Sequence, residues 1–275
     1  MRDPFSLLRR RLVLLAWSIG AMLGHPGLAQ ASTSFAALPP LPKSDLRLQG
    51  PSPLLPDLRT LAPSGFYIQE GPTGRILRLA NTVWNSGRGP LELVGETPQY
   101  TEPTAVRQML FAEDGALRDR FVGTFIWHAS HGHWHIEHFA EYRLWSLRDD
   151  FEVERVVAES TKVSYCLIDT ELVTLDLSGA PDHKVYRGCG RTRQGLSVGW
   201  GDEYRAHLDG QSIELGDLPD GLYALVSTVN PAGLLVESDY ANNSAVVYLS
   251  IIASKVTVIS DVLLEKERCL SENDC

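Results

Sequence analysis

Residues 76–94 read I-L-R-L-A-N-T-V-W-N-S-G-R-G-P-L-E-L-V, which is two apolar-rich runs on either side of a turn. The first run, 76–84, partly alternates between apolar and polar side chains, as a strand with one buried face does. The turn at 85–90 holds two glycines and a proline, which end regular structure. The second run, 91–94, comes directly after the turn. This stretch predicts two β-strands joined by a short connection.

The same pattern of short apolar runs separated by turn residues continues along the chain. Further strand-like runs lie at 139–147, 162–167, 223–229, 244–252 and 256–262. No amphipathic helical window longer than about two turns stands out. Regularly spaced short strands favour an all-β fold, which we expect to be a single-domain β-sandwich with long irregular loops.

The first residues have the features of an export signal. Four arginines lie in residues 1–11, residues 12–23 are almost entirely apolar, and Ala29-Gln30-Ala31 forms a small-x-small cleavage site. Roughly twelve apolar residues are too few to span a bilayer, so we interpret 1–31 as a signal peptide rather than an anchor. The protein is therefore expected to be secreted or periplasmic after cleavage near Ala31. Residues 32–63 are rich in proline and predict an extended arm, which leaves 64–275 as the main domain.

Charge and cysteine content narrow the class of protein. Without residues 1–31, four of the 25 basic and one of the 34 acidic side chains are lost, which leaves a net charge of −12. An acidic chain argues against nucleic acid as a partner. The four cysteines, Cys166, Cys189, Cys269 and Cys275, predict two disulfides in an exported chain. Of the three possible pairings, the local one joins Cys166 to Cys189 and Cys269 to Cys275.

Histidines are concentrated in the middle of the chain. Five of the eight lie within eleven residues, at His128, His131, His133, His135 and His138. On a strand, the alternate residues His131, His133 and His135 would share one face, with Trp134 and Ile136 on the other. His128 and His138 have the opposite parity and are poorer candidates. A straight strand would separate His131 and His135 by roughly 13 Å, too far for one metal ion, so the segment must bend, at Gly132.

A set of imidazole ligands favours Cu(II), Zn(II) or Ni(II) over calcium or magnesium. Copper has the highest affinity of these ions, and an exported protein can encounter it. A run of histidines with no metal is the ordinary alternative. Zinc in a hydrolase is a third reading, but no H-E-x-x-H pattern supplies a general base.

Beyond the histidines themselves, the sequence resembles a known family. The segment W-H-A-S-H-G-H-W-H at 127–135 is similar to the copper-binding segment of the lysyl oxidases, and Glu141 and Tyr142 match residues that come after that segment in the family. The likeness continues through E-S-T-K-V-S-Y-C-L-I-D-T at 159–170 and Q-G-L-S at 194–197 to Tyr204, and returns at V-N-P (229–231) and V-E-S-D-Y-A-N-N (236–243). It also includes 55–58 and 67–69, so it covers most of the chain beyond the signal peptide.

The resemblance implies an enzyme with two cofactors. His131, His133 and His135 would bind copper, and Lys162 and Tyr204 would join to form lysine tyrosylquinone. Such an enzyme oxidises primary amines or peptidyl lysine with dioxygen, giving an aldehyde, hydrogen peroxide and ammonia. The chemistry explains the residue types, because the amine that adds to the oxidised phenol must lose its proton, which lysine can do and arginine cannot. Asp202 and Glu203, which flank Tyr204, are the candidates for the catalytic base.

The resemblance further implies a calcium site, since oxygen-bearing side chains within a few residues suit that ion. Its ligands would be Asp57, the carbonyl of Leu58, Glu237, Asp239, Asn242 and Asn243. The alternative is an ordinary turn capped by Asp and Asn side chains.

This chain also departs from the family. The animal enzymes have a cysteine at the position of Ser130, which forms a disulfide to a cysteine aligned with Cys189. That disulfide cannot form here, and the resemblance then implies Cys166–Cys189 as a substitute. We expect a copper-dependent amine oxidase; the alternative is a copper-binding β domain without catalysis, for storage or adhesion.

Overall fold

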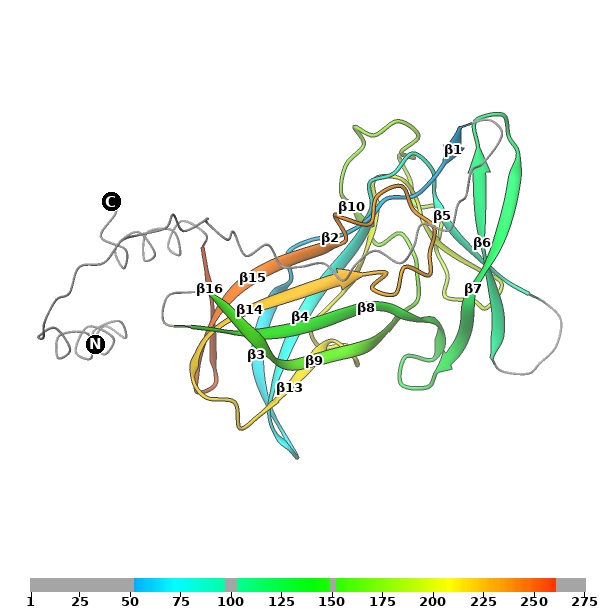
Figure 1. The fold of residues 1–275 in the computed structure, drawn as a ribbon. Helices are drawn as coiled ribbons and strands as arrows, with labels where there is room; N and C mark the ends of the chain where they lie inside the picture. The colour runs from blue at the N-terminus through cyan, green and yellow to red at the C-terminus, as the bar shows by residue number, and fades with distance from the viewer. Residues whose placement is uncertain (1–51, 97–102, 149–151, 261–275) are drawn as a thin grey trace, which may run out of the picture. The chain divides into compact units, whose positions relative to one another are not determined.

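The computed structural model describes residues 52–96, 103–148 and 152–260, which form β-strands and no α-helix (Figure 1). The expectation of an all-β fold is therefore confirmed. No segment of these residues has the length and apolarity of a membrane-spanning helix. The signal peptide 1–31, most of the Pro-rich arm, Cys269 and Cys275 lie outside the described residues. Residues 52–63, the described end of the arm, contribute two short strands to the sheets.

All strand pairs are antiparallel, and they form two sheets. The larger has the order β11-β5-β6-β7-β8-β14-β15-β16, with β1 beside β6 and β9 beside β8. Its strands are β1 (Pro53–Leu54), β5 (Leu91–Gly95), β6 (Thr104–Ala112), β7 (Leu117–His128), β8 (His133–Leu147), β9 (Val153–Tyr165), β11 (Arg193–Leu196), β14 (Gly221–Val229), β15 (Ser244–Ile252) and β16 (Lys255–Ile259). The smaller has the order β10-β12-β4-β13, with β2 and β3 also beside β4. Its strands are β2 (Leu58–Thr60), β3 (Ser64–Gly71), β4 (Gly74–Asn85), β10 (Glu171–Leu172), β12 (Trp200–Tyr204) and β13 (Ser212–Gly216).

The two sheets share one hydrophobic core. Leu79 and Val83 of β4 belong to the same buried cluster as Tyr142 of β8 and Leu225 of β14. Burying such side chains between facing sheets is the main stabilising term of a β-sandwich.

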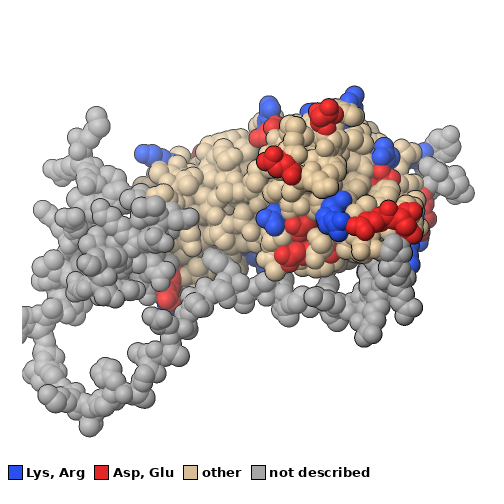
Figure 2. All heavy atoms as spheres, turned by 90° about the horizontal axis from the view of Figure 1, so that it is seen from above, with Lys and Arg blue, Asp and Glu red and all other residues tan. Residues whose placement is uncertain are grey.

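In Figure 2, charged side chains of both signs gather over one half of the visible face, and the described surface beside them is mostly uncharged.

Several strands were not anticipated from the sequence, and β6 shows why. Its residues alternate between buried and half-buried, but two of the buried ones are polar, Thr104 and Gln108. Gln108 has no exposed surface because its amide donates to the Val236 carbonyl at 2.7 Å and its carbonyl accepts from the Val236 N–H at 2.7 Å. A polar side chain whose hydrogen bonds are all made can occupy the buried face of a strand. Such a residue interrupts the apolar alternation from which the strand would be predicted.

Candidate copper and quinone site

The histidine segment is a β-hairpin turn rather than one strand. His128 ends β7, His133 begins β8, and the two residues pair across the hairpin. The backbone N–H groups of His131 and Gly132 donate to the His128 carbonyl at 3.1 and 2.8 Å. Gly132 has φ +71°, a conformation that glycine adopts without strain, so the predicted bend lies where expected.

This turn corrects the argument from strand parity. Of the three histidines assigned to one strand face, only His133 and His135 lie on a strand, β8, whereas His131 lies in the turn. Nδ1 of His131 and Nε2 of His135 are 3.2 Å apart, far closer than along a straight strand. Two nitrogens bound to one ion at about 2.0–2.1 Å can have this separation at an angle of roughly 100°.

His128 joins this cluster, although parity made it a poorer candidate. Its ring stacks on that of His135, with centroids 4.5 Å apart. Ligand nitrogens of His128, His131 and His135 all lie within 4.8 Å of one another. The ring of His133 lies 4.9 Å from that of His135. Parity failed for His128 because it applies within one strand, and the turn separates His128 from the other histidines. His138 is exposed, with φ +56°, and is not part of the cluster.

The environment of the rings suits a metal ion. Burial is the largest cause that lowers the pKa of His131 and His133, and it acts with the neighbouring imidazoles to lower the pKa of His135 to about 3. The rings are therefore neutral near pH 7, the form that binds metals. The Nε2 atoms of His131 and His133 are buried without a hydrogen-bond partner. Buried nitrogens of this kind are costly unless a ligand satisfies them, so these residues fit copper.

A hydrogen bond orients the most buried ring. His135 has no exposed surface, and its Nδ1 lies 2.9 Å from the hydroxyl of Ser164 on β9. Contacts of this type fix which nitrogen of a metal-binding histidine is available. Here Nε2 remains directed toward His131 and Tyr204.

Tyr204 reaches the cluster from the opposite sheet. It ends β12 and is 6% exposed, and its hydroxyl lies 3.5 Å from Nε2 of His135. The backbone N–H of Cys166 donates to that hydroxyl at 2.7 Å. The ring of Tyr165 lies 4.0 Å from that of Tyr204, centroid to centroid. Burial raises the pKa of Tyr204, so the free phenol is protonated near neutral pH.

Lys162 lies on β9, two residues before Ser164. The pairing of β8 with β9 changes register between Ala140 and Tyr142, opposite this part of the strand. Two residues along a strand correspond to about 6.6 Å, so the backbone of Lys162 lies close to the residue that orients His135. The side chain of Lys162 is outside what the structure describes.

A disulfide lies beside the histidine cluster and Tyr204. Cys166 and Cys189 are bonded, with Cα atoms 5.4 Å apart, which confirms the local pairing for these two residues. The Trp134 N–H, between His133 and His135, donates to the Cys189 carbonyl at 3.1 Å. The nearest nitrogen of His133 lies within 4.8 Å of both sulfurs. One crosslink thus connects the histidine strand with the residue that binds the Tyr204 hydroxyl.

Comparison with known proteins places the chain in a family. The model of the lysyl oxidase family matches residues 118–260, which include the histidine turn, β9 and Tyr204. The chain belongs to the lysyl oxidase family. It is 40% identical to the protein-lysine 6-oxidase of Gallus gallus over 120 residues, which are 42% of this chain and 26% of that protein. It is 39% identical to the enzyme of that name from Sus scrofa, over 42% of this chain and 43% of that protein. It is 38% identical to lysyl oxidase homolog 1 of Homo sapiens, over 46% and 20%. The aligned stretch thus spans less than half of each relative.

The two acids that directly precede Tyr204 in this lysyl oxidase family member differ in their surroundings. Asp202 is 1% exposed, and its Oδ2 is buried without a partner. On a strand it shares a face with Tyr204. Burial raises the pKa of Asp202 well above its usual range. Glu203 is half-buried and accepts a hydrogen bond from Arg205 at 3.2 Å. The structure therefore distinguishes the two candidates for the base, and Asp202 is the one with an unsatisfied carboxyl oxygen.

The residues implied for calcium come together only in part. The Asn242 amide donates to both carboxylate oxygens of Asp57 at 3.1 and 3.2 Å. Glu237 accepts from the Leu58 N–H at 2.8 Å and from the Asn243 amide at 2.8 Å. The Oδ1 atoms of Asn242 and Asn243 are buried and unpartnered.

Two features of this group favour a plain turn. Asp239 is exposed, and its Oδ1 accepts from the Ala241 N–H at 2.9 Å, as in an ordinary Asx turn. Burial raises the pKa of Glu237 to about 7, which weakens its charge in the ion-free state. The carboxylate and carbonyl oxygens of the group are nevertheless the ligand type that calcium prefers.

Proposed function

We propose that this protein is a copper-dependent amine oxidase of the lysyl oxidase type, which oxidises primary amines or peptidyl lysine. One observation carries the proposal. The hydroxyl of buried Tyr204 lies 3.5 Å from Nε2 of His135, in a cluster of neutral imidazoles. Membership of the family supports it, because that site lies within the matched region.

His131, His133 and His135 are the proposed copper ligands. The buried, unpartnered Nε2 atoms of His131 and His133 and the lowered pKa values of all three support the assignment. His128 stacks on His135 and lines the same cluster, so it either shapes the ligand set or belongs to it. Ser164 holds the ring of His135 in place.

Tyr204 and Lys162 are the proposed precursors of lysine tyrosylquinone. The Cys166 N–H donates to the phenol oxygen and the Tyr165 ring packs against the phenol ring. The rings of Tyr204 and His135 lie in an edge-to-face arrangement, with centroids 6.0 Å apart. Bound copper and the finished quinone would together accept two electrons from an amine, so that amine, dioxygen and water become aldehyde, ammonia and hydrogen peroxide. Asp202 is the proposed acceptor of the proton that leaves the carbon next to the amine. Because burial raises the pKa of this carboxyl group, the role requires that it be ionised when the substrate is bound.

The proposal includes export and a calcium ion. The signal peptide 1–31 would direct the chain out of the cytoplasm, to a compartment in which copper and dioxygen are both available. Asp57, the Leu58 carbonyl, Glu237, Asp239, Asn242 and Asn243 would bind calcium and fasten β2 to the loop that precedes β15. The contacts between Asp57 and Asn242 support this connection between the residue before β2 and the loop before β15.

The decisive experiment is mass spectrometry of tryptic peptides from copper-loaded protein. A crosslinked peptide that joins the Lys162 and Tyr204 segments, with the mass change of quinone formation, is the expected result. Separate, unmodified peptides in protein that holds copper would contradict the enzyme and favour the copper-binding domain without catalysis. Lys162→Ala is the matched control, since it removes the amine that forms the crosslink and leaves the histidines intact.

A further inference from the structure

A basic loop lies beside the proposed active site of an otherwise acidic chain. Residues 182–193, hereafter the basic loop, contain Lys184, Arg187, Arg191 and Arg193 and a single acid, Asp182. The whole chain carries a net charge of −9. Asp182 is already in contact with His183, at 2.6 Å between carboxylate oxygen and ring nitrogen. The loop therefore concentrates positive charge in a chain whose net charge is negative.

The basic loop lines a shallow pocket of about 300 Å³ that is open to solvent, and the lining includes Tyr186, Arg187, Gly190 and Arg193. This volume is at the small end for ligand pockets and suits one or two side chains of a larger partner. Arg193 is committed to Glu92, which accepts from Nε and Nη2 at 3.0 and 2.6 Å. Arg187 is exposed, and its Nε donates to the Lys184 carbonyl at 2.7 Å. That hydrogen bond holds Nε of Arg187 in place at the pocket, and a neutral carbonyl acceptor does not cancel the charge of the guanidinium group.

The basic loop is held rigidly. The buried carboxylate of Asp169 accepts from the N–H groups of Val185 and Tyr186 at 2.8 and 3.1 Å. The Lys184 ammonium donates to the Thr170 carbonyl at 2.9 Å. Preorganised charges of this kind bind a partner at a lower entropic cost than charges on a mobile loop.

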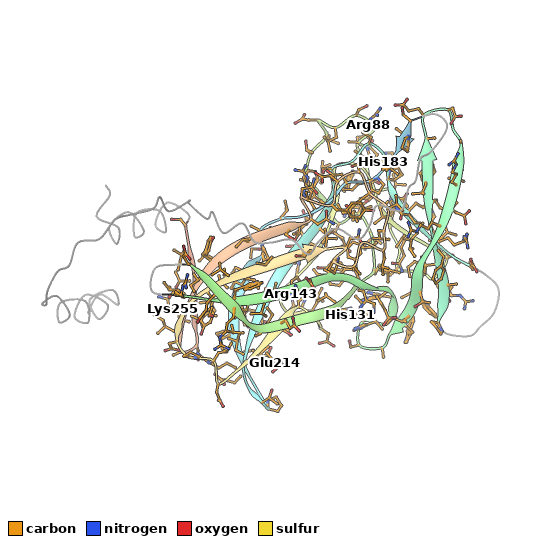
Figure 3. The ribbon with its side chains drawn as sticks, viewed as in Figure 1. Arg88, His131, Arg143, His183, Glu214 and Lys255 are labelled. Carbon is orange, nitrogen blue, oxygen red and sulfur yellow. A yellow bond between two sulfur atoms is a disulfide. The ribbon has the colours of Figure 1, made fainter. Side chains whose placement is uncertain are left out.

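The basic loop is also joined to the proposed site. Figure 3 shows His183, at its start, well separated from His131 in the histidine turn. The loop then approaches the histidines at Cys189, which is bonded to Cys166 and accepts from the Trp134 N–H. The Arg191 guanidinium lies 5.9 Å from the centre of the Trp134 ring, next to His135 in sequence. Gly188 and Gly190, on either side of Cys189, line the pocket, so a molecule there would lie within one residue of the contact between the basic loop and β8.

We infer that the basic loop binds an acidic peptide segment and thereby selects peptidyl lysines that have glutamate or aspartate nearby. This rests on the proposed function for its purpose, since the bound segment would carry the amine to be oxidised. A peptide is the favoured occupant because the pocket holds only one or two side chains, and the adjoining site needs a primary amine on the same molecule. Opposite charges bring such a partner to the surface and fix its register.

The test measures binding without turnover. A fluorescent peptide with four glutamates around a norleucine, in place of lysine, cannot be oxidised, so its affinity reports on the pocket alone. We expect fluorescence anisotropy to show binding that weakens with salt. Arg187→Glu changes one interaction of unlike charges into one of like charges, which at about 5 Å in water corresponds to roughly tenfold weaker binding. Arg155→Glu, on an exposed arginine of β9, is the matched control and should leave affinity unchanged.

Three results would overturn the inference. The first is equal affinity for the glutamate peptide and a glutamine peptide, and the second is an equal loss in Arg155→Glu. The third is tighter binding of an acidic polysaccharide than of the peptide. Oxidation of a small uncharged-chain amine such as butylamine reports separately on the proposed function, because it does not need the basic loop. Peptide binding without amine oxidation would thus contradict the enzyme and keep the pocket, and the reverse result would contradict the pocket alone.

Discussion

Tyr204 and His135 approach within 3.5 Å although 69 residues separate them and they belong to different sheets. Each has a second contact with the end of β9 or the residue after it, His135 with Ser164 and Tyr204 with the Cys166 N–H. The C-terminal end of β9 is therefore the common support of the proposed metal ligands and the proposed quinone precursor. Lys162, on the same strand, would act where these supports meet.

Tyr204→Phe should abolish quinone formation and leave copper binding intact. The phenylalanine ring keeps the packing against Tyr165, and only the hydroxyl that accepts from Cys166 is lost, at a cost of about 1 kcal/mol in stability. Copper content by metal analysis and visible absorbance of the same sample would check both parts. A variant that still develops quinone absorbance would show that another residue is the precursor.

Ser164→Ala should weaken copper binding by about ten- to a hundredfold, the usual effect of removing a partner that orients a metal-binding histidine. The hydroxyl is 2.9 Å from Nδ1 of His135, and alanine leaves that nitrogen without its partner. Competition with a chelator of known affinity would measure the change. Ser160→Ala, at another position of β9, is the control, and equal weakening in both variants would contradict a specific role.

Replacing both Cys166 and Cys189 by serine should lower the free energy of unfolding by roughly 3 kcal/mol, because the crosslink closes a loop of 23 residues. Quinone yield should also fall, since the crosslink joins the histidine strand to the Cys166 N–H that positions Tyr204. Urea denaturation and visible absorbance would measure the two effects. Unchanged quinone yield in the destabilised variant would separate stability from positioning.

Asp202→Asn should reduce amine turnover by at least about a hundredfold, as expected when a general base is removed. The amide is close in size to the carboxyl group, so copper and quinone should both remain. Peroxide release together with visible absorbance would test this. Glu203→Gln, at the neighbouring half-exposed position, should have little effect on turnover, and a larger loss there would reverse the assignment.

Calcium should raise the melting temperature, because an ion that binds only the folded chain adds about 2.7 kcal/mol at a hundred times its dissociation constant. Asp57→Asn should abolish the increase, since its carboxylate is the contact of Asn242. Asp220→Asn, at an exposed carboxylate paired with Arg75, is the control. No increase in the unmodified protein would leave the plain Asx turn as the explanation.

The sequence by itself determined the class of fold and supplied the residues proposed for the site. Alternating apolar residues such as those of β4 and β14 predict strands because strand side chains alternate between faces. The density of histidines and their neutral nitrogen ligands indicated a transition metal, and the family resemblance selected Lys162 and Tyr204. The local cysteine pairing also came from the sequence for Cys166 and Cys189.

Only the tertiary structure decided how the parts meet. The hairpin turn at Gly132 brought His128 to the cluster, which strand parity could not predict because parity does not extend across a turn. The choice of Asp202 over Glu203 as the candidate base depended on which of the two side chains is buried, and the sequence does not show this. The approach of Tyr204 to His135 is a contact between two sheets, and such contacts arise from packing of the whole core, for which no short stretch of sequence carries a signal.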